Sequence, residues 1–227
     1  MTQTLNWINN ISLILQIATV FVWIFRFSRI PRAMQWLGVY LAFNVVIQLV
    51  AKQLWLRSMN NLPLLHLNTL VELVLTSVFF REIYINQQWF KRHFTLIVGL
   101  MVGVIVLNSI FLEPIYTFNS NAKVLTQAVF IGCVILYLFE SFGKIDFSQS
   151  RYQGILLICF ALLLYHAGSL LIFSFAQYFP HRLLPSGKPS GSAVSFQGFW
   201  VVNAILNLIF QLLAAFAFAK AGFRSNK

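Results

Sequence analysis

The sequence predicts an all-α polytopic membrane protein, a bundle of seven transmembrane helices with the N-terminus outside and the C-terminus inside. Of its 227 residues, 59% are hydrophobic and only 9% are charged, whereas soluble domains carry about 25% charged residues. The apolar residues come in runs of about 20, the length of a membrane-spanning helix, and not in the alternation of a β-barrel. This composition excludes a soluble enzyme, a nucleic-acid-binding domain and a secreted disulfide scaffold.

Seven apolar runs are long enough to span a bilayer. They cover residues 7–28, 36–57, 65–87, 94–113, 122–143, 153–179 and 196–221. Because these runs use most of the chain, we predict a single membrane domain over residues 1–227. The stretch from Pro180 to Ser195 is rich in Pro, Gly and Ser, which predicts a surface loop. All six prolines lie at or beyond the ends of the predicted helices, so we expect the helices to be uninterrupted.

The basic residues give the orientation, because loops on the cytoplasmic side carry an excess of Lys and Arg. The side that holds the C-terminus collects eleven of the sixteen, namely Arg26, Arg29, Arg32, Arg81, Lys91, Arg92, Lys144, Arg151, Lys220, Arg224 and Lys227. The other side collects five, namely Lys52, Arg57, Lys123, Arg182 and Lys188. The richer side is therefore predicted to be cytoplasmic.

The formal net charge of +11 fits the same topology. Short basic loops face the anionic cytoplasmic leaflet of a lipid bilayer, and the charges are too scattered for a nucleic-acid partner. We expect an integral protein of a bacterial cytoplasmic (inner) membrane. Cys133 and Cys159 both fall inside predicted spans, so they are interpreted as packing residues.

Polar side chains inside the spans repeat at helical spacing. In the second span Asn44, Gln48 and Lys52 are four residues apart, which places them on one helix face. Other stripes are Ser12, Gln16, Thr19 and Trp23 in the first span, Thr69, Glu72 and Thr76 in the third, and Asn203, Asn207 and Gln211 in the seventh. Single polar residues often only join neighbouring helices. Faces repeated on several helices, however, indicate a shared polar interior.

These stripes predict a polar pocket that opens outward and is closed toward the cytoplasm by Phe, Leu, Ile and Val. The candidate ligand-binding residues are Gln16, Asn44, Gln48, Lys52, Asn68, Glu72, His166, Trp200, Asn203 and Asn207. Tryptophans 7, 55 and 200 would rim the pocket, although for Trp7 and Trp55 an interfacial belt is the favoured interpretation.

Lys52 and Glu72 are predicted to form a buried ion pair. The two residues lie nine and eleven positions from Asn61, on the two sides of the turn between the second and third spans. At about 1.5 Å per residue they reach a similar depth. In the alternative, Lys52 extends to the outer surface and Glu72 stands alone. The pair is favoured because a lone ionised carboxylate in the membrane must find a partner or become neutral.

Catalytic and metal-binding motifs are absent. The sequence contains no GxSxG, HExxH, CxxC or Walker-type loop. We therefore expect no enzyme activity, no metal and no cofactor. Gly99 and Gly103 in the fourth span form a small-xxx-small pattern, which indicates close helix packing within the bundle or in a homodimer.

The most distinctive parts of the sequence lie in two spans. They are His66–Glu72 and Phe79–Tyr84 in the third span, and Trp200–Asn207 in the seventh. They resemble uncharacterised bacterial seven-helix membrane proteins of sensor type, similar to the membrane modules of sensor histidine kinases. The resemblance implies a sensor whose output lies on a separate partner, because only six residues follow Ala221. It carries over no functional residue.

Two function hypotheses follow. The first is a membrane sensor or receptor-like protein that binds a small ligand in the polar pocket and regulates a partner, such as a histidine kinase. The alternative is a small-solute transporter or channel that uses the same pocket, with Glu72 as a proton-coupling carboxylate. The cytoplasmic half discriminates between them, because transport needs a polar path there.

The topology is testable with reporter fusions. Because of the eleven-to-five distribution of basic residues, fusions at residue 227 and within residues 114–121 are expected to report opposite sides of the membrane. A cytoplasmic signal from a fusion within 114–121 would contradict the predicted orientation.

Overall fold

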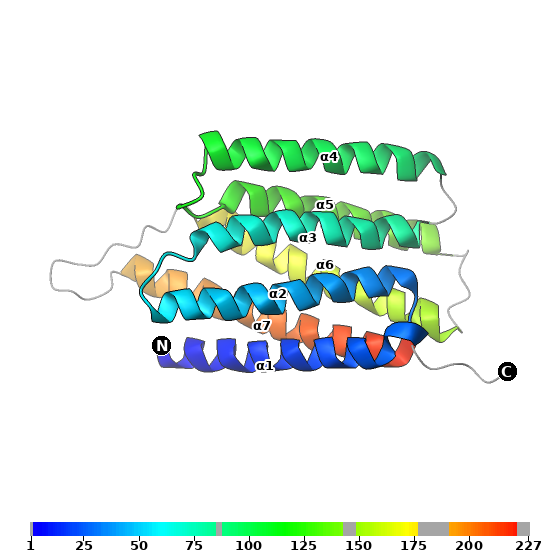
Figure 1. Cartoon of the computed structure of the whole chain (residues 1–227), viewed down its shortest axis with the longest axis horizontal. Coiled ribbons are helices and arrows are strands. Elements are labelled where there is room, and N and C mark those ends of the chain that lie inside the picture. The colour runs from blue at the N-terminus through cyan, green and yellow to red at the C-terminus, as the bar shows by residue number, and fades with distance from the viewer. Residues whose placement is uncertain (1, 85–87, 143–148, 177–190, 222–227) are drawn as a thin grey trace.

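The computed structural model describes residues 2–84, 88–142, 149–176 and 191–221. These residues form seven α-helices and no strand: α1 (Thr2–Arg26), α2 (Arg32–Leu56), α3 (Leu62–Ile83), α4 (Gln88–Phe111), α5 (Ser120–Ser141), α6 (Ser150–Ala176) and α7 (Gly191–Ala221). Figure 1 shows them lying side by side along the long axis of the molecule. All seven are long and apolar enough to cross a membrane, as the sequence predicts.

The predicted spans match the observed helices, but α1, α4 and α7 begin at Thr2, Gln88 and Gly191, five or six residues before the predicted starts. The predicted loop from Pro180 to Ser195 is wrong for residues 191–195, because α7 already begins at Gly191. No proline follows Pro189, so nothing interrupts the helix from there on. The predicted span ends at residues 87, 143 and 179, like residues 180–190, lie outside the described residues.

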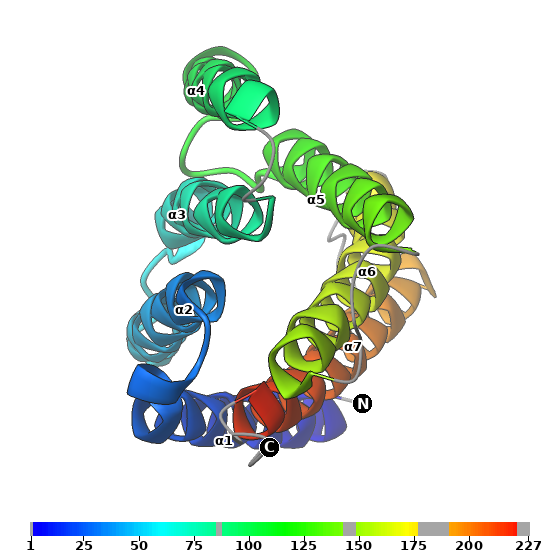
Figure 2. The ribbon, with the colours of Figure 1, turned by 90° about the vertical axis from the view of Figure 1, so that its right-hand side faces the viewer.

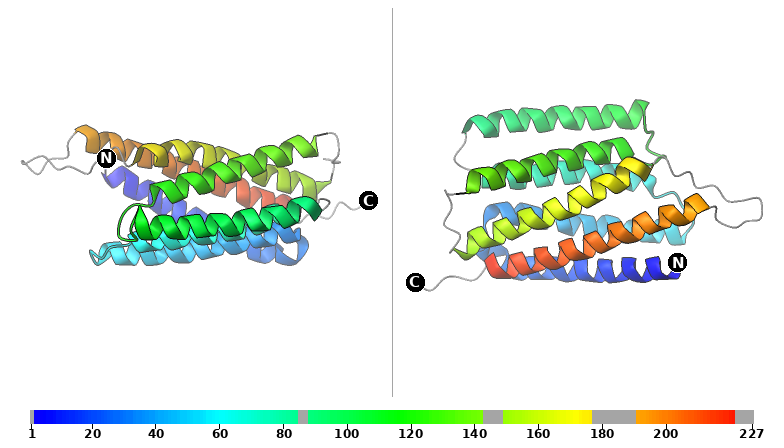
Figure 3. Two further views of the ribbon diagram at one scale, coloured as in Figure 1. Left: turned by 90° about the horizontal axis from the view of Figure 1, so that it is seen from above. Right: turned by 180° about the vertical axis from the view of Figure 1, so that it is seen from behind.

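The odd-numbered helices all run in one direction. We call the end of the bundle where α1, α3, α5 and α7 begin its amino end, and the opposite end its carboxy end (Figure 1). In the end-on view of Figure 2, α1, α2, α3, α5, α6 and α7 follow one another around a ring, and α4 lies outside it. Figure 3 shows α6 and α7 side by side, and α7 also packs along α1.

The α1–α2 connection is fixed by a proline and a glutamine. A short 3₁₀ helix, η1 (Phe27–Arg29), leads to Pro31, whose restricted φ suits the residue that caps α2. The side-chain amide of Gln35 donates to the Phe27 carbonyl at 3.0 Å. Gly38 allows α2 to approach α1, since a Cβ there would lie 2.0 Å from the Trp23 indole.

A tight hydrogen-bonded turn ends α2. The Ser58 and Met59 amides donate to the Trp55 and Leu54 carbonyls, at 3.0 and 2.9 Å. This Schellman pattern needs a left-handed residue, and Ser58 supplies it with φ of 56°. A side chain at this φ strains the backbone, so the position favours glycine.

We therefore expect Ser58→Gly to raise the free energy of unfolding by about 0.5–1 kcal/mol, through relief of the left-handed strain. Denaturant unfolding of the purified protein in detergent measures the change. Ser58→Ala is the matched control, because it removes the hydroxyl but keeps the Cβ. Equal stabilisation by alanine and glycine would show that φ at this position is not strained.

Candidate functional site

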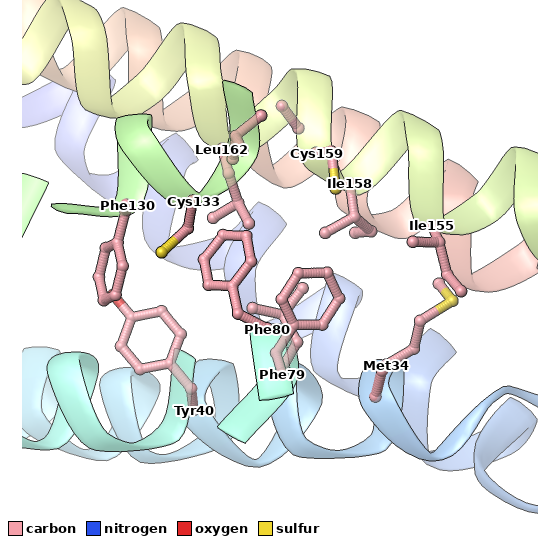
Figure 4. Close-up of a cluster of buried hydrophobic side chains, with 14 of the residues drawn as sticks. Met34, Tyr40, Phe79, Phe80, Phe130, Cys133, Ile155, Ile158, Cys159 and Leu162 are labelled. Carbon is pink, nitrogen blue, oxygen red and sulfur yellow. The ribbon is translucent and has the colours of Figure 1, made fainter. Parts of the chain in front are cut away.

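The buried residues of the bundle divide along its axis into a polar part and an apolar part. Among the described residues, most buried polar side chains lie in the amino half or near mid-depth, whereas Ser77 and Ser141 lie farther toward the carboxy end. Toward the carboxy end the interior is filled by Met34, Phe79, Phe80, Ile158 and their neighbours. Figure 4 shows this apolar cluster between α2, α3, α5 and α6.

Contacts between α3 and α5, which run parallel, build the polar part in layers. In the first layer the Asn119 amide donates to the Thr69 hydroxyl at 2.8 Å. In the second, Lys123 donates to Glu72. Phe80 and Phe130 form a further layer, with ring centroids 6.0 Å apart. The polar layers therefore end on aromatic rings.

One polar layer lies between the ion pair and these rings. Thr76 follows Glu72 by four residues on α3, and Gln127 follows Lys123 by four residues on α5. Each is thus one turn closer to the carboxy end than its charged neighbour, on the same helix face. Both side chains are completely buried.

The Glu72–Lys123 ion pair is the main electrostatic feature of the interior. Glu72 has 0% of its surface exposed and Lys123 has 7%. Only the Oε2 atom of Glu72 receives the lysine, and Oε1 has no hydrogen-bond partner. Tyr40, Tyr165 and His166 lie close enough to interact electrostatically with the pair. Side chains of α2, α3, α5 and α6 thus meet around two opposite charges.

Three aromatic rings cover the ion pair on the side of the amino end. Phe118, which precedes α5, stacks on Phe173 of α6 with centroids 5.5 Å apart. Trp200 of α7 meets both rings edge-on, at 5.7 Å from each. The Lys123 ammonium lies 5.9 Å from the centroid of Phe173, within the range of a cation–π contact. We call these three residues the aromatic lid.

A second polar seam joins α1, α6 and α7. The Ser169 hydroxyl donates to Asn203 at 2.6 Å, and the Asn207 amide donates to the Ser12 hydroxyl at 2.8 Å. The Thr19 hydroxyl donates to the backbone carbonyl of Gln211 at 3.1 Å. These bonds are the interhelical links that polar side chains make in membrane bundles. The predicted candidates Asn203 and Asn207 therefore have a demonstrable packing role.

A third network closes the amino end between α3, α4 and α5. The His66 Nε2 atom lies 3.1 Å from the Thr117 carbonyl, which can only accept, so Nε2 carries a proton. Its Nδ1 atom lies 2.9 Å from the Ser109 hydroxyl. Glu113 accepts hydrogen bonds from the Asn108 side chain and the Asn121 backbone amide. This network fixes the position at which α5 begins.

Eleven buried side-chain atoms of the described residues have no hydrogen-bond partner. They are Gln16 Nε2, Trp23 Nε1, Asn44 Oδ1, Asn68 Oδ1, Glu72 Oε1, Thr76 Oγ1, Ser77 Oγ, Gln127 Nε2 and Oε1, His166 Nδ1 and Gln211 Oε1. Each unmade bond costs about 1–3 kcal/mol, whereas a whole protein is stable by about 5–15 kcal/mol. Buried polar atoms of this kind are usually hydrogen-bonded, so water or a polar ligand is the expected partner for them.

The predicted pairing of Lys52 with Glu72 is wrong. Lys52 is exposed and donates to the Asn10 side chain of α1 at 3.0 Å. Gln48 is exposed as well, so neither residue faces the interior that the stripe in α2 predicts. Asn44 alone of this stripe is half-buried, beside Tyr40.

Helix geometry explains this error. A step of four residues advances about 40° around a helix, so two such steps move a side chain by about 80°. In α2 this rotation carries Gln48 and Lys52 out of the interior, whereas Asn203, Asn207 and Gln211 of α7, at the same spacing, stay buried or half-buried. Thr69, Glu72 and Thr76 are separated by steps of three and four, whose rotations largely cancel, and all three side chains are buried.

The remaining candidates lie in or near the interior. Gln16, Glu72 and His166 are buried, whereas Asn68, Trp200, Asn203 and Asn207 are half-buried. The sequence analysis missed Lys123, which it assigned to the basic residues outside the membrane. Lys123 precedes Thr126 by three residues and Gln127 by four, so the three side chains share one helix face. Thr126 and Gln127 are both fully buried, and this spacing is the signal that could have placed Lys123 in the interior.

Two further predictions concern α4 and metals. Gly99 and Gly103 are exposed, and a Cβ at either position would meet nothing within 4 Å, so no helix of the described chain covers them. Within the described ranges, no three His, Cys, Asp or Glu side chains are grouped so that they could hold a metal ion.

The ion pair is testable by mutation. Because removal of one partner strands a buried charge, Glu72→Gln or Lys123→Met is expected to lower the free energy of unfolding by about 3–5 kcal/mol. The double variant is expected to lose less free energy of unfolding than the two single variants lose together. Denaturant titration in detergent gives all three values.

Lys52→Met is the matched control. It removes a lysine that is exposed and paired only with Asn10, so a loss below about 1 kcal/mol is expected. A loss as large as that of Lys123→Met would contradict the observed pairing.

Comparisons with known proteins complete the description of the site. No protein-family model, no curated protein and no solved structure matches this chain.

Proposed function

We propose that the chain is an integral membrane receptor that binds a small polar ligand at the Glu72–Lys123 layer and signals to a separate partner. The observation that carries this proposal is the ion pair itself. It lies between the aromatic lid and the Phe80–Phe130 layer, next to buried polar atoms that have no partner. Costly intramembrane charges of this kind typically mark functional sites.

The membrane assignment is supported by the helices and their surfaces. Large apolar side chains such as Phe25, Leu100, Phe111 and Phe139 are 71–82% exposed, as expected for a surface that faces lipid. Because Lys123 lies inside the bundle, only four basic residues remain on the side predicted to be outside, against eleven on the other. This supports an N-terminus outside and a C-terminus in the cytoplasm of a bacterial inner membrane.

The closed carboxy half favours a receptor. Phe79, Phe80 and Phe130 are completely buried, and beyond them the interior is mainly apolar. A receptor needs no polar path through this half. It needs two helices whose relative position can change, and α3 and α5 meet both at the ion pair and at the carboxy end, where the Tyr84 hydroxyl donates to the Cys133 carbonyl at 2.9 Å. A shift at the ligand layer would thus reach a partner, such as a histidine kinase, on the cytoplasmic side.

The alternative is a small-solute transporter that uses the same layer. The fully buried Glu72 favours it, since an intramembrane carboxylate can couple the movement of a solute to that of a proton. Such a transporter would have to separate Phe80 from Phe130 in every cycle.

Reconstituted vesicles distinguish the two functions. A receptor is expected to be stabilised by one of the polar solutes in a screen of amino acids, sugars and nucleosides, without transporting it. Glu72→Gln is expected to abolish this response, because it removes one of the two charges of the proposed site. Thermal unfolding measures the response, and radiolabelled solute measures transport.

Lys52→Met serves as the control that should keep the response. Saturable uptake of a solute that is lost in Glu72→Gln would contradict the receptor proposal and establish the transporter.

A further inference from the structure

We propose that the Glu72–Lys123 layer binds a small zwitterion, a molecule that carries an ammonium and a carboxylate close together, such as an α-amino acid. This inference rests on the proposed function and specifies the ligand of the same site. Three properties of the layer lead to it: its charge balance, its free hydrogen-bonding atoms and its aromatic cover.

The charge balance excludes ligands with a net charge. Glu72 and Lys123 neutralise each other inside the bundle. No other residue that is charged at neutral pH is buried among the described residues. A ligand with a net charge would therefore leave an uncompensated charge in the interior of the membrane, at high cost. The ligand must be neutral overall.

The buried polar atoms that lack a hydrogen-bond partner exclude an apolar ligand. They include donors and acceptors, so the ligand must offer both as well. Glu72 Oε1 and Gln127 Oε1 accept no hydrogen bond, with the Tyr40 hydroxyl close to the Glu72 carboxylate, and Gln127 Nε2 and the Thr76 hydroxyl are donors without acceptors. The Lys123 ammonium has three donors, and the structure gives it one hydrogen bond, to Glu72. A ligand ammonium would donate to the acceptor oxygens of Glu72 and Gln127. A ligand carboxylate would accept from the donors of Gln127, Thr76 and Lys123.

The two sets lie close to each other. Lys123 and Gln127, like Glu72 and Thr76, are one helical turn apart, which is about 6 Å along the axis. This separation fits a ligand of a few heavy atoms, in which the two charged groups are attached to the same carbon atom. A longer zwitterion would place one group beyond the layer, against the Phe80–Phe130 rings.

The aromatic lid provides the third property. The faces of aromatic rings attract cations, and Lys123 already lies over Phe173. A ligand ammonium beside Glu72 would lie beneath the same cluster. The lid residues come from three segments, the α4–α5 connection, α6 and α7.

The test is direct binding to the full chain in maltoside micelles, which carry no charge. The probes are glycine, L-alanine and L-serine, with propionate, propylamine and lactamide as matched analogues that lack one or both charges. We expect saturable binding in calorimetry, with a rise in unfolding temperature, for at least one zwitterion and for none of the analogues.

Variants locate the binding. Glu72→Gln and Lys123→Met are expected to weaken binding at least tenfold, and Lys52→Met is expected to leave it unchanged. Gln127→Leu provides a variant that strands no charge and is also expected to bind at least tenfold more weakly. It keeps the test valid if the charge variants do not fold.

Three outcomes would overturn the inference: no saturable binding of any zwitterion, equal binding of a singly charged analogue, or full binding by Gln127→Leu. Each is distinct from failure of the receptor proposal. If zwitterions bind and are also transported, the ligand class holds and the receptor does not. If only an uncharged solute stabilises the protein without uptake, the receptor holds and the ligand class does not.

Discussion

A carboxylate and an ammonium that face each other inside an apolar bundle constrain the whole arrangement of α3 and α5. Neither charge can be withdrawn without stranding the other, so the two helices must stay in the register in which Glu72 meets Lys123. The same register brings Asn119 to Thr69 and Phe130 to Phe80. The network around His66 and Glu113 supports it at the amino end, because it fixes where α5 begins.

The elements could be predicted from the sequence because the bilayer leaves few solutions. Apolar runs of about 20 residues in a bilayer must become helices whose backbone groups bond internally, and a helix long and apolar enough to cross a membrane is present at each of the seven predicted spans. The division of the interior was also predictable, since Glu72 and Thr76 precede Phe79 and Phe80 in one helix. Both properties depend only on order along a single helix.

Contacts between helices were much harder to predict from the sequence. The partner of Glu72 depends on which helices are neighbours around the ring, and the sequence offers two lysines, Lys52 and Lys123, at suitable depth. Lys52 is nearer along the chain, but the rotation of α2 carries it away to Asn10. Lys123 lies 51 positions from Glu72, and only the parallel packing of α3 and α5 brings the two together. Pairing in a helical bundle is therefore a property of packing and register.

The two aromatic boundaries of the ion-pair layer differ in a way that bears on function. Phe80 and Phe130 belong to the two helices that the ion pair itself joins, so they can separate only if that register changes. Phe118, Phe173 and Trp200 come from three segments, so the contacts of this boundary are not confined to α3 and α5. A site that opens at the amino end while its carboxy side stays closed admits a ligand without providing a path across the membrane. Under the proposed function, a ligand at this layer contacts α3 and α5 directly, because these two helices hold the charges.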